Sequence, residues 1–89
     1  MGRVILVVSD ALRDDTAAMQ MGYLQHLVEA GKATRYTVVA ELPTMSRPLY
    51  ETLHTGVPVS VHGVTNNRIV RRSTMPNVFE EAVRRGRTT

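Results

Sequence analysis

The feature that most constrains this fold is an unbroken apolar run, VILVV at residues 4–8, which leads into Ser9 and Asp10. Apolar and polar residues do not alternate within the run, so both faces of an extended segment would be buried. That pattern is typical of a central parallel strand. We therefore predict a strand over residues 3–9. Asp10 then lies at its carboxyl end, where open α/β sheets place their functional sites.

A helix and a second strand are predicted next along the chain. Apolar residues at positions 17, 21, 24 and 28 predict an amphipathic helix that begins near the polar residues 14–16. Gly31 is expected to end that helix. Residues 34–42 alternate as a strand does, and Pro43 ends the alternation.

Two more helices are predicted in the second half. The first begins near Ser46, has Pro48 in its first turn and ends at Gly56. Residues 57–73 show little periodicity and are expected to form a long connection. The last helix is expected to have Thr74 as its cap and to end before Gly86.

The order of these elements is strand, helix, strand, helix, loop, helix, which predicts an α/β fold with helices on both faces of a mostly parallel sheet. Two strands do not make a stable sheet of that kind. We therefore expect residues 1–89 to be the N-terminal part of a single larger domain, or to be completed by a partner. Exposed sheet edges would favour self-association.

Composition excludes several classes of protein. The chain has no cysteine, which excludes disulfide scaffolds, cysteine-based zinc sites and thiol catalysis. No apolar stretch approaches the roughly 20 residues of a membrane span, and the apolar run near the N-terminus lacks the cleavage site of a signal peptide. We expect a cytoplasmic protein without a membrane partner.

Basic residues are concentrated toward the end of the chain, and the net charge is +3. A solvated helix face explains them better than nucleic-acid binding does, because no aromatic residues for base stacking lie among them. No nucleic-acid partner is therefore expected. The arginines of this segment are Arg68, Arg71, Arg72, Arg84, Arg85 and Arg87.

Two residues are candidates for chemistry. Asp10 is either a turn or cap residue or a ligand for a divalent cation, because carboxylate oxygens suit Mg, Mn or Zn. Ser46 is either a helix N-cap or a nucleophile, because a helix N-terminus favours an anionic phosphoryl group. Thr44 is the alternative hydroxyl.

Other polar residues near these have two interpretations each. Arg47 is either a phosphate ligand or a solvent-facing residue. His54 and His62 have no second metal ligand at a suitable spacing, so both are interpreted as structural. The side chains of Asn66 and Asn67 are either turn-forming, or one of them donates to a phosphate oxygen.

Four motifs in order carry a family resemblance: VVSDALR at residues 7–13, LPTMS at 42–46, TGVP at 55–58 and HGVTNN at 62–67. Together they resemble the type I phosphodiesterase and nucleotide pyrophosphatase family of the alkaline phosphatase superfamily. The resemblance spans nearly the whole chain.

The resemblance implies a three-layer α/β/α domain of alkaline-phosphatase-like type that holds two metal ions, usually zinc. It assigns Asp10 to one metal, Ser46 to the nucleophile that also touches that metal, and Asn67 to a phosphate oxygen. The implied reaction is attack by Ser46 on a phosphodiester or phosphonate ester. A phospho-enzyme forms, and a metal-bound hydroxide releases it.

Some residues depart from the family pattern. Ser46 replaces the more usual Thr, the run Ser-Arg-Pro at 46–48 replaces a Thr-Phe-Pro-like run, and Ala11 stands where Gly is frequent. The sulfatase branch does not fit, whereas phosphomutase relatives remain possible. The family's other metal ligands are expected beyond residue 89, so we predict that this polypeptide alone is inactive.

Two further interpretations stay open. The chain is alternatively a non-catalytic truncated module that retains only the scaffold. A nucleotide-binding α/β domain is the weakest option, because no glycine-rich phosphate loop follows the first predicted strand.

Overall fold

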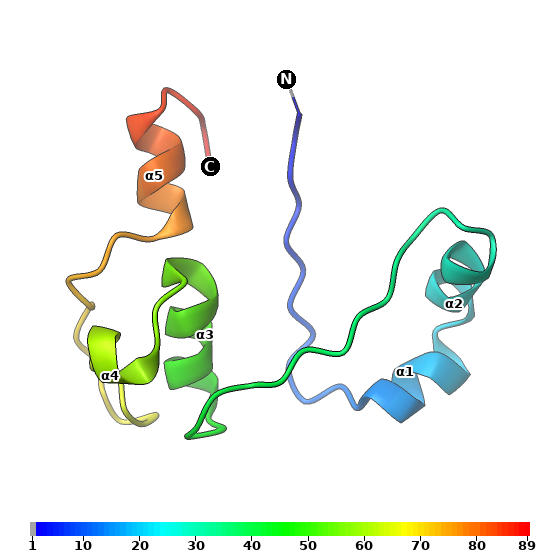
Figure 1. Ribbon diagram of the computed structural model, residues 1–89, viewed down its shortest axis with the longest axis horizontal. Coiled ribbons are helices and arrows are strands. Elements are labelled where there is room, and N and C mark those ends of the chain that lie inside the picture. Colours follow the sequence, from blue (N-terminus) through cyan, green and yellow to red (C-terminus); the bar gives the residue numbers. More distant parts are fainter. Residues whose placement is uncertain (1) are drawn as a thin grey trace. The chain divides into compact units, whose positions relative to one another are not determined.

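The computed structural model describes residues 2–89. Contacts divide the chain into two compact units, one ending at Val38 and the other spanning Val39–Thr89. The helices within the described range are shown in Figure 1: α1 Asp14–Gln20, α2 Gly22–Glu29, α3 Ser46–Thr55, α4 Val59–His62 and α5 Val78–Arg84.

The predicted sheet is wrong. Residues 3–9 and 34–40 run as irregular traces, and no strand forms anywhere in residues 2–89 (Figure 1). The apolar side chains that a sheet would bury are exposed, as Val4 at 94% and Val39 at 92% show. A strand is stabilised by ladder hydrogen bonds and by layers on its faces, and an isolated pair is marginal in water. The partial three-layer α/β/α sandwich is therefore not the fold of these residues.

The single helix predicted in the first unit is two helices. The break is at Met21, whose backbone (φ −93°, ψ 67°) is not helical, and Gly22 begins α2. Glycine is a poor helix former, because it loses more backbone freedom than any other residue. Gly31 follows α2 with φ +70°, the left-handed conformation expected of a helix-ending glycine.

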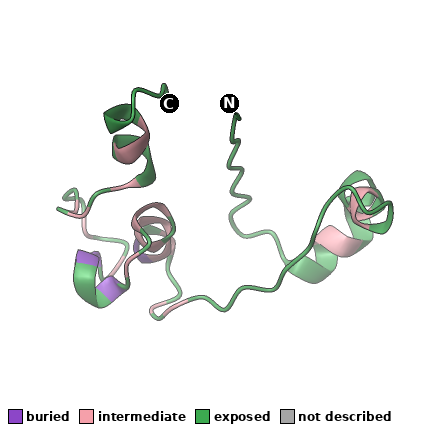
Figure 2. Ribbon diagram, turned by 45° about the horizontal axis from the view of Figure 1, so that its top comes forward, coloured by how far each residue is buried: buried purple, intermediate pink, exposed green. Residues whose placement is uncertain are grey.

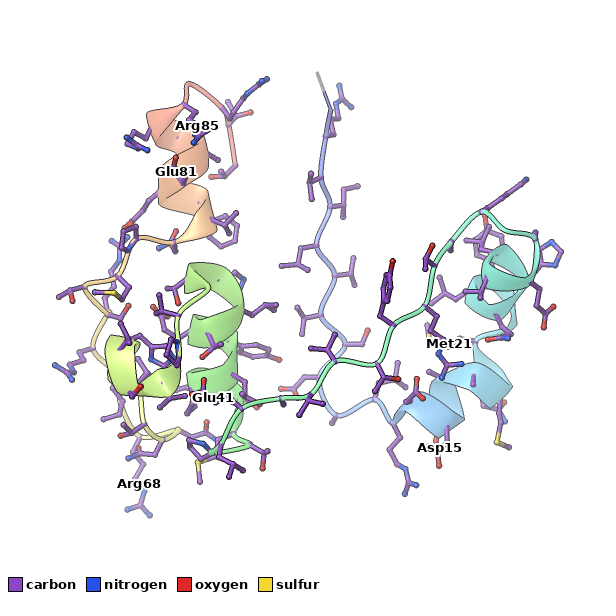
Figure 3. The ribbon with its side chains drawn as sticks, viewed as in Figure 1. Asp15, Met21, Glu41, Arg68, Glu81 and Arg85 are labelled. Carbon is purple, nitrogen blue, oxygen red and sulfur yellow. The ribbon has the colours of Figure 1, made fainter. Side chains whose placement is uncertain are left out.

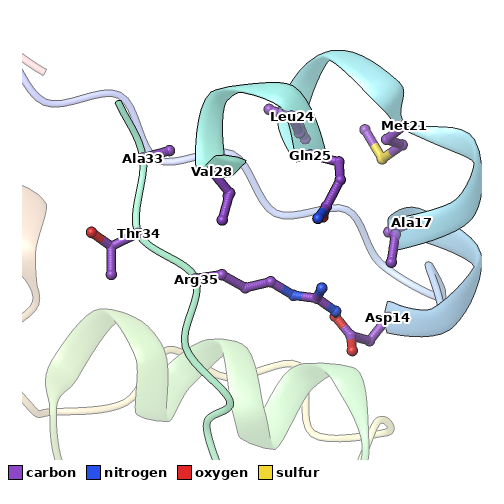
Figure 4. A pocket seen from close by; sticks show the side chains of 10 residues that line it. Asp14, Ala17, Met21, Leu24, Gln25, Val28, Ala33, Thr34 and Arg35 are labelled. Atoms are coloured by element: carbon purple, nitrogen blue, oxygen red, sulfur yellow. The ribbon is translucent and has the colours of Figure 1, made fainter. Parts of the chain in front are cut away.

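The apolar residues of the predicted helix still lie on one side of α1 and α2 despite this break. They line an open groove of about 280 Å³ against residues 33–35 (Figure 4). At one end of the groove the Arg35 guanidinium reaches Asp14 from across it, with Nη2 2.5 Å from Oδ1. The ion pair raises the pKa of Arg35 and ties the segment after α2 back to the start of α1. These apolar residues in the groove are Ala17, Met21, Leu24 and Val28.

In the second unit α3 contacts both α4 and α5. The buried residues of this unit lie in α3, in α4 and two residues after the end of α4 (Figure 2). Helix α3 has the predicted start and is followed by Gly56 at φ +73°. Helix α4 was not predicted, since four residues are too few to show a helical period. The buried residues are Pro48, Val59, His62 and Val64.

The predicted cap of the last helix is also wrong. Asn77, not Thr74, caps α5, and its Oδ1 accepts hydrogen bonds from the amides of Phe79 and Glu80, each at 3.0 Å. Gly86 follows the helix with φ +74°, as predicted. Within the described part of the chain, no helix has the length and apolar character needed to span a bilayer.

Candidate functional site

Helix α3 places Ser46 at its first position. The residue before it, Met45, is extended and provides no side-chain cap. Pro48 has no N–H, and the Leu49 N–H donates to the carbonyl of Met45 at 3.1 Å. The amide donors of this helix start are therefore those of Ser46 and Arg47.

Asn67 caps α3 from a distant loop. Its Oδ1 accepts the backbone N–H of Arg47 at 3.0 Å. This bond brings together Ser46 and Asn67, two of the residues predicted for the site. Because Oδ1 accepts, the donor end of the amide is Nδ2. The neighbouring Asn66 instead closes its own turn, accepting the N–H of Arg68 at 2.8 Å.

The guanidinium of Arg47 has a partner that neither of its interpretations predicted. Its Nη1 donates to the carbonyl oxygen of Ile69 at 2.8 Å. Arg68, between the two attachment points, is exposed, and its side chain is directed away from α3 (Figure 3). Arg47 therefore binds the 66–69 turn to α3 instead of only facing solvent.

His62 is structural, as predicted, and both of its ring nitrogens are used. It is 6% exposed. Its Nδ1 accepts the N–H of Val64 at 3.0 Å, which leaves Nε2 as the protonated nitrogen. Nε2 lies 2.9 Å from the hydroxyl of Thr52, which donates to Glu41 at 3.5 Å. The Glu41 carboxylate also accepts the Val59 N–H at the start of α4, at 3.0 and 3.2 Å.

His54 is also placed structurally. Its Nδ1 lies 2.7 Å from the carbonyl oxygen of Tyr50 one turn earlier in α3. The imidazole packs against the ring of Phe79, with centroids 5.2 Å apart and planes 33° apart. This contact belongs to the packing of α3 on α5.

Asp10 lies in the first unit, in a turn closed by a hydrogen bond from the Leu12 N–H to the Ser9 carbonyl at 3.4 Å. Ala11 in this turn has φ +61°, the left-handed conformation that favours glycine. The two units are not placed relative to one another, so no distance from Asp10 to Ser46 is defined. Within the second unit, the predicted site residues Ser46 and Asn67 are brought together.

The candidate metal ligands do not complete a site. Within the described residues, no group of three or more His, Cys, Asp or Glu side chains could hold a metal ion. Asp10 and Ser46 offer one carboxylate and one hydroxyl. A catalytic zinc ion takes about three ligands from the protein. These residues by themselves therefore do not fit the metal that the resemblance implies.

Several arginines near the end of the chain are paired with the acidic residues of α5. The Glu81 carboxylate accepts from Arg84 at 2.8 Å and from Arg85 at 2.7 Å (Figure 3). These bonds, that of Arg84 first, lower the pKa of Glu81 from 4.5 to about 2. Arg72 forms an ion pair with Glu80. Part of the predicted basic surface is thus neutralised within the chain.

Sequence reasoning missed the roles of Glu41, Arg47 and Asn77. Only Asn77 has a local signal: an Asn three residues before Glu80 matches the pattern of a helix N-terminus. Glu41 and Arg47 bind partners about 20 residues away, at separations of 18 for Glu41–Val59 and 22 for Arg47–Ile69. No local pattern predicts such pairs.

Comparison with known proteins bears directly on this site. The family model described as type I phosphodiesterase / nucleotide pyrophosphatase matches residues 4–86. No curated protein and no solved structure matches the sequence significantly. The matched range includes Asp10, Ser46 and Asn67. The chain therefore belongs to the type I phosphodiesterase / nucleotide pyrophosphatase family.

Proposed function

We propose that Ser46 is the nucleophile and Asn67 the phosphate-binding amide of a hydrolase that cleaves phosphodiester or phosphonate esters. Family membership supports the reaction class of a phosphodiesterase. The observation that carries the assignment is the 3.0 Å bond from the Arg47 N–H to Asn67 Oδ1. It holds a carboxamide beside the helix start where Ser46 lies, although 20 residues separate the bonded pair.

The chemistry follows from this arrangement. The Ser46 Oγ forms a bond to phosphorus, and the bond from phosphorus to the leaving oxygen breaks with its electron pair on that oxygen. The Ser46 hydroxyl proton passes to solvent, and solvent protonates the leaving oxygen. Negative charge on the phosphoryl oxygens is favoured near the positive end of the α3 dipole. The Nδ2 of Asn67 donates to a non-bridging oxygen, as oxyanion stabilisation requires.

Asp10 belongs to this proposal as one metal ligand, with the Ser46 oxygen as a second. The family is generally metal-dependent. Within residues 2–89, no group of three or more His, Cys, Asp or Glu side chains completes a metal site. Two zinc ions in a complete domain, of which residues 1–89 form the N-terminal part, remain our proposal. The 89-residue polypeptide alone is proposed to be inactive.

A non-catalytic module is the second candidate. The hydrogen bonds of Arg47 and His62, and the Oδ1 atom of Asn67, all serve to hold the second unit together. A chain that kept only the scaffold would need these bonds and would not need the Ser46 hydroxyl or the donor end of Asn67.

An isosteric pair of substitutions separates the two candidates. In Asn67→Asp, the carboxylate still accepts the Arg47 N–H but has no group that can donate to phosphate. In Asn66→Asp, the same charge is introduced one residue earlier and the acceptor for the Arg68 N–H is kept. The ¹⁵N-labelled chain is titrated with inorganic phosphate and with orthovanadate, observing the Ser46 amide and the Asn67 side-chain amide by NMR.

We expect both reporters to shift in the wild type. Asn67→Asp should weaken binding about tenfold to a hundredfold more than Asn66→Asp does, the effect of one lost hydrogen bond to a charged group. Equal weakening in the two variants would reject the phosphate-binding role of Asn67. Absence of any shift in the wild type would favour the non-catalytic module.

A further inference from the structure

Arg47 attaches the 66–69 turn to α3 at two points. Its backbone N–H donates to Asn67 Oδ1 at 3.0 Å, and its guanidinium Nη1 donates to the Ile69 carbonyl at 2.8 Å. The two acceptors lie on either side of Arg68 in the sequence. One residue of the helix thus bonds to both ends of a short loop segment.

The 66–69 turn is closed by its own hydrogen bonds. The Asn66 side chain accepts the Arg68 N–H at 2.8 Å, and the Asn66 carbonyl accepts the Ile69 N–H at 3.4 Å. The turn can therefore move as a unit. A single bond to α3 would allow it to rotate about that bond, whereas two bonds to one helical residue restrict the rotation.

The orientation of the turn determines what the Asn67 amide offers to a ligand. With Oδ1 on the Arg47 N–H, the amide's donor group, Nδ2, is the end left to bind an anion. A flipped or rotated amide would present its oxygen and repel a phosphoryl group. A guanidinium suits the task, because its rigid fork loses less freedom per bond than a lysine ammonium does.

We propose that Arg47 is a positioning residue: through the Ile69 carbonyl it holds the turn so that Asn67 presents its amide donor beside Ser46. This inference rests on the proposed function, because it assigns the orientation of the amide in that site. Direct binding of phosphate by Arg47 is the competing role. It requires the guanidinium to leave the Ile69 carbonyl.

Three variants test the positioning role. Arg47→Met keeps an unbranched stem and the backbone N–H but removes the guanidinium and with it the bond to Ile69. Arg47→Lys retains one charged donor. Arg68→Met is the matched control, because it makes the same change of residue within the turn that Arg47 contacts, and Arg68 joins the hydrogen bonds described through its backbone only.

The first measurement needs no ligand. The scalar coupling across the hydrogen bond, from the Arg47 amide nitrogen to the Asn67 Cγ, and the order parameter of the Asn67 side-chain amide are recorded by NMR. Both should fall in Arg47→Met, recover in part in Arg47→Lys and stay unchanged in Arg68→Met. An Asn67 amide that stays equally ordered in Arg47→Met would overturn the positioning role.

The second measurement is the titration with inorganic phosphate. Arg47→Met should weaken binding about threefold to tenfold relative to Arg68→Met, the range expected for one lost hydrogen bond. If Arg47 binds phosphate itself, its own guanidinium signals shift on titration while the Asn67 amide stays ordered, and the proposal fails. Suppose that no variant binds phosphate, but the order parameter of the Asn67 amide falls only in Arg47→Met. The positioning role is then supported and the proposed function is rejected.

Discussion

The Nε2 of His62 lies 2.9 Å from the Oγ1 of Thr52, which joins α4 to α3 through a buried imidazole. We expect Thr52→Val to destabilise the chain by about 1–3 kcal/mol, because the buried Nε2–H then has no acceptor. Valine has nearly the shape of threonine, so packing changes little. Urea unfolding followed by circular dichroism measures the difference.

Thr65→Val is the control for that substitution. Thr65 is exposed and lies just after the buried Val64. The same chemical change there should alter the free energy of unfolding by less than about 0.5 kcal/mol. Equal effects at the two positions would mean that the bond between His62 and Thr52 contributes nothing specific.

We expect the stability of α5 to depend on pH through Glu81. Its pKa is lowered in the folded chain from 4.5 to about 2, so the folded state binds this proton less tightly than the unfolded state does. The stabilisation is present above pH 4.5 and is lost as the pH falls toward 2. A carboxyl ¹³C NMR titration should report the lowered pKa directly.

Substituting the partners of Glu81 checks the cause of that shift. Arg84→Gln should raise the pKa of Glu81 more than Arg85→Gln does, because the hydrogen bond from Arg84 is the larger cause. Arg68→Gln, outside α5, should leave it unchanged. High salt should bring the pKa closer to 4.5, since these side chains are exposed and screened. The same shift in all three variants would rule out a local cause.

Ala11→Gly should stabilise the turn that contains Asp10. Ala11 has φ +61°, a conformation that costs an L-residue roughly 1 kcal/mol or more and costs glycine nothing comparable. The Leu12 amide, which donates to Ser9 at 3.4 Å, should then exchange with solvent more slowly. Ala17→Gly, inside α1, is the opposite control and should weaken that helix. Faster exchange of Leu12 in Ala11→Gly would show that the turn is not limited by this strain.

The metal and activity predictions are tested on the purified 89-residue polypeptide. We expect no tight zinc binding by calorimetry, because Asp10 and Ser46 supply fewer than the roughly three protein ligands of a catalytic zinc ion. A nitrophenyl phosphodiester should be hydrolysed no faster than in buffer with zinc. Metal-dependent turnover that Ser46→Ala abolishes and Thr44→Ala leaves intact would refute the prediction.

The sequence predicts a helix end in this chain where a single residue determines that end. Gly31, Gly56 and Gly86 each take a positive φ at or just after the helix ends they predict. Ser46 and Pro48 predicted the start of α3 for the same reason: both residue types favour a first turn. These effects depend only on residues close in the sequence, so the sequence is sufficient to predict these helix boundaries.

The sheet failed as a prediction because strand formation depends on partners that the apolar run does not specify. VILVV at residues 4–8 indicates what would be buried but not what would bury it. The candidate site likewise combines features that the sequence predicts with contacts that depend on the fold. Motif order identified Ser46 and Asn67, whereas the Arg47–Ile69 contact spans 22 residues and is a property of the fold.

The exposure of residues 4–8 has a consequence for how this polypeptide is handled. An extended β-branched segment with no charge within it, such as Ile5 at 86% exposure and Val7 at 77%, is the kind that recruits identical segments into intermolecular ladders. The structure that an experiment observes then depends on the protein concentration. A dilute sample would report the two helical units, whereas a concentrated one would report whatever assembly the apolar segment nucleates.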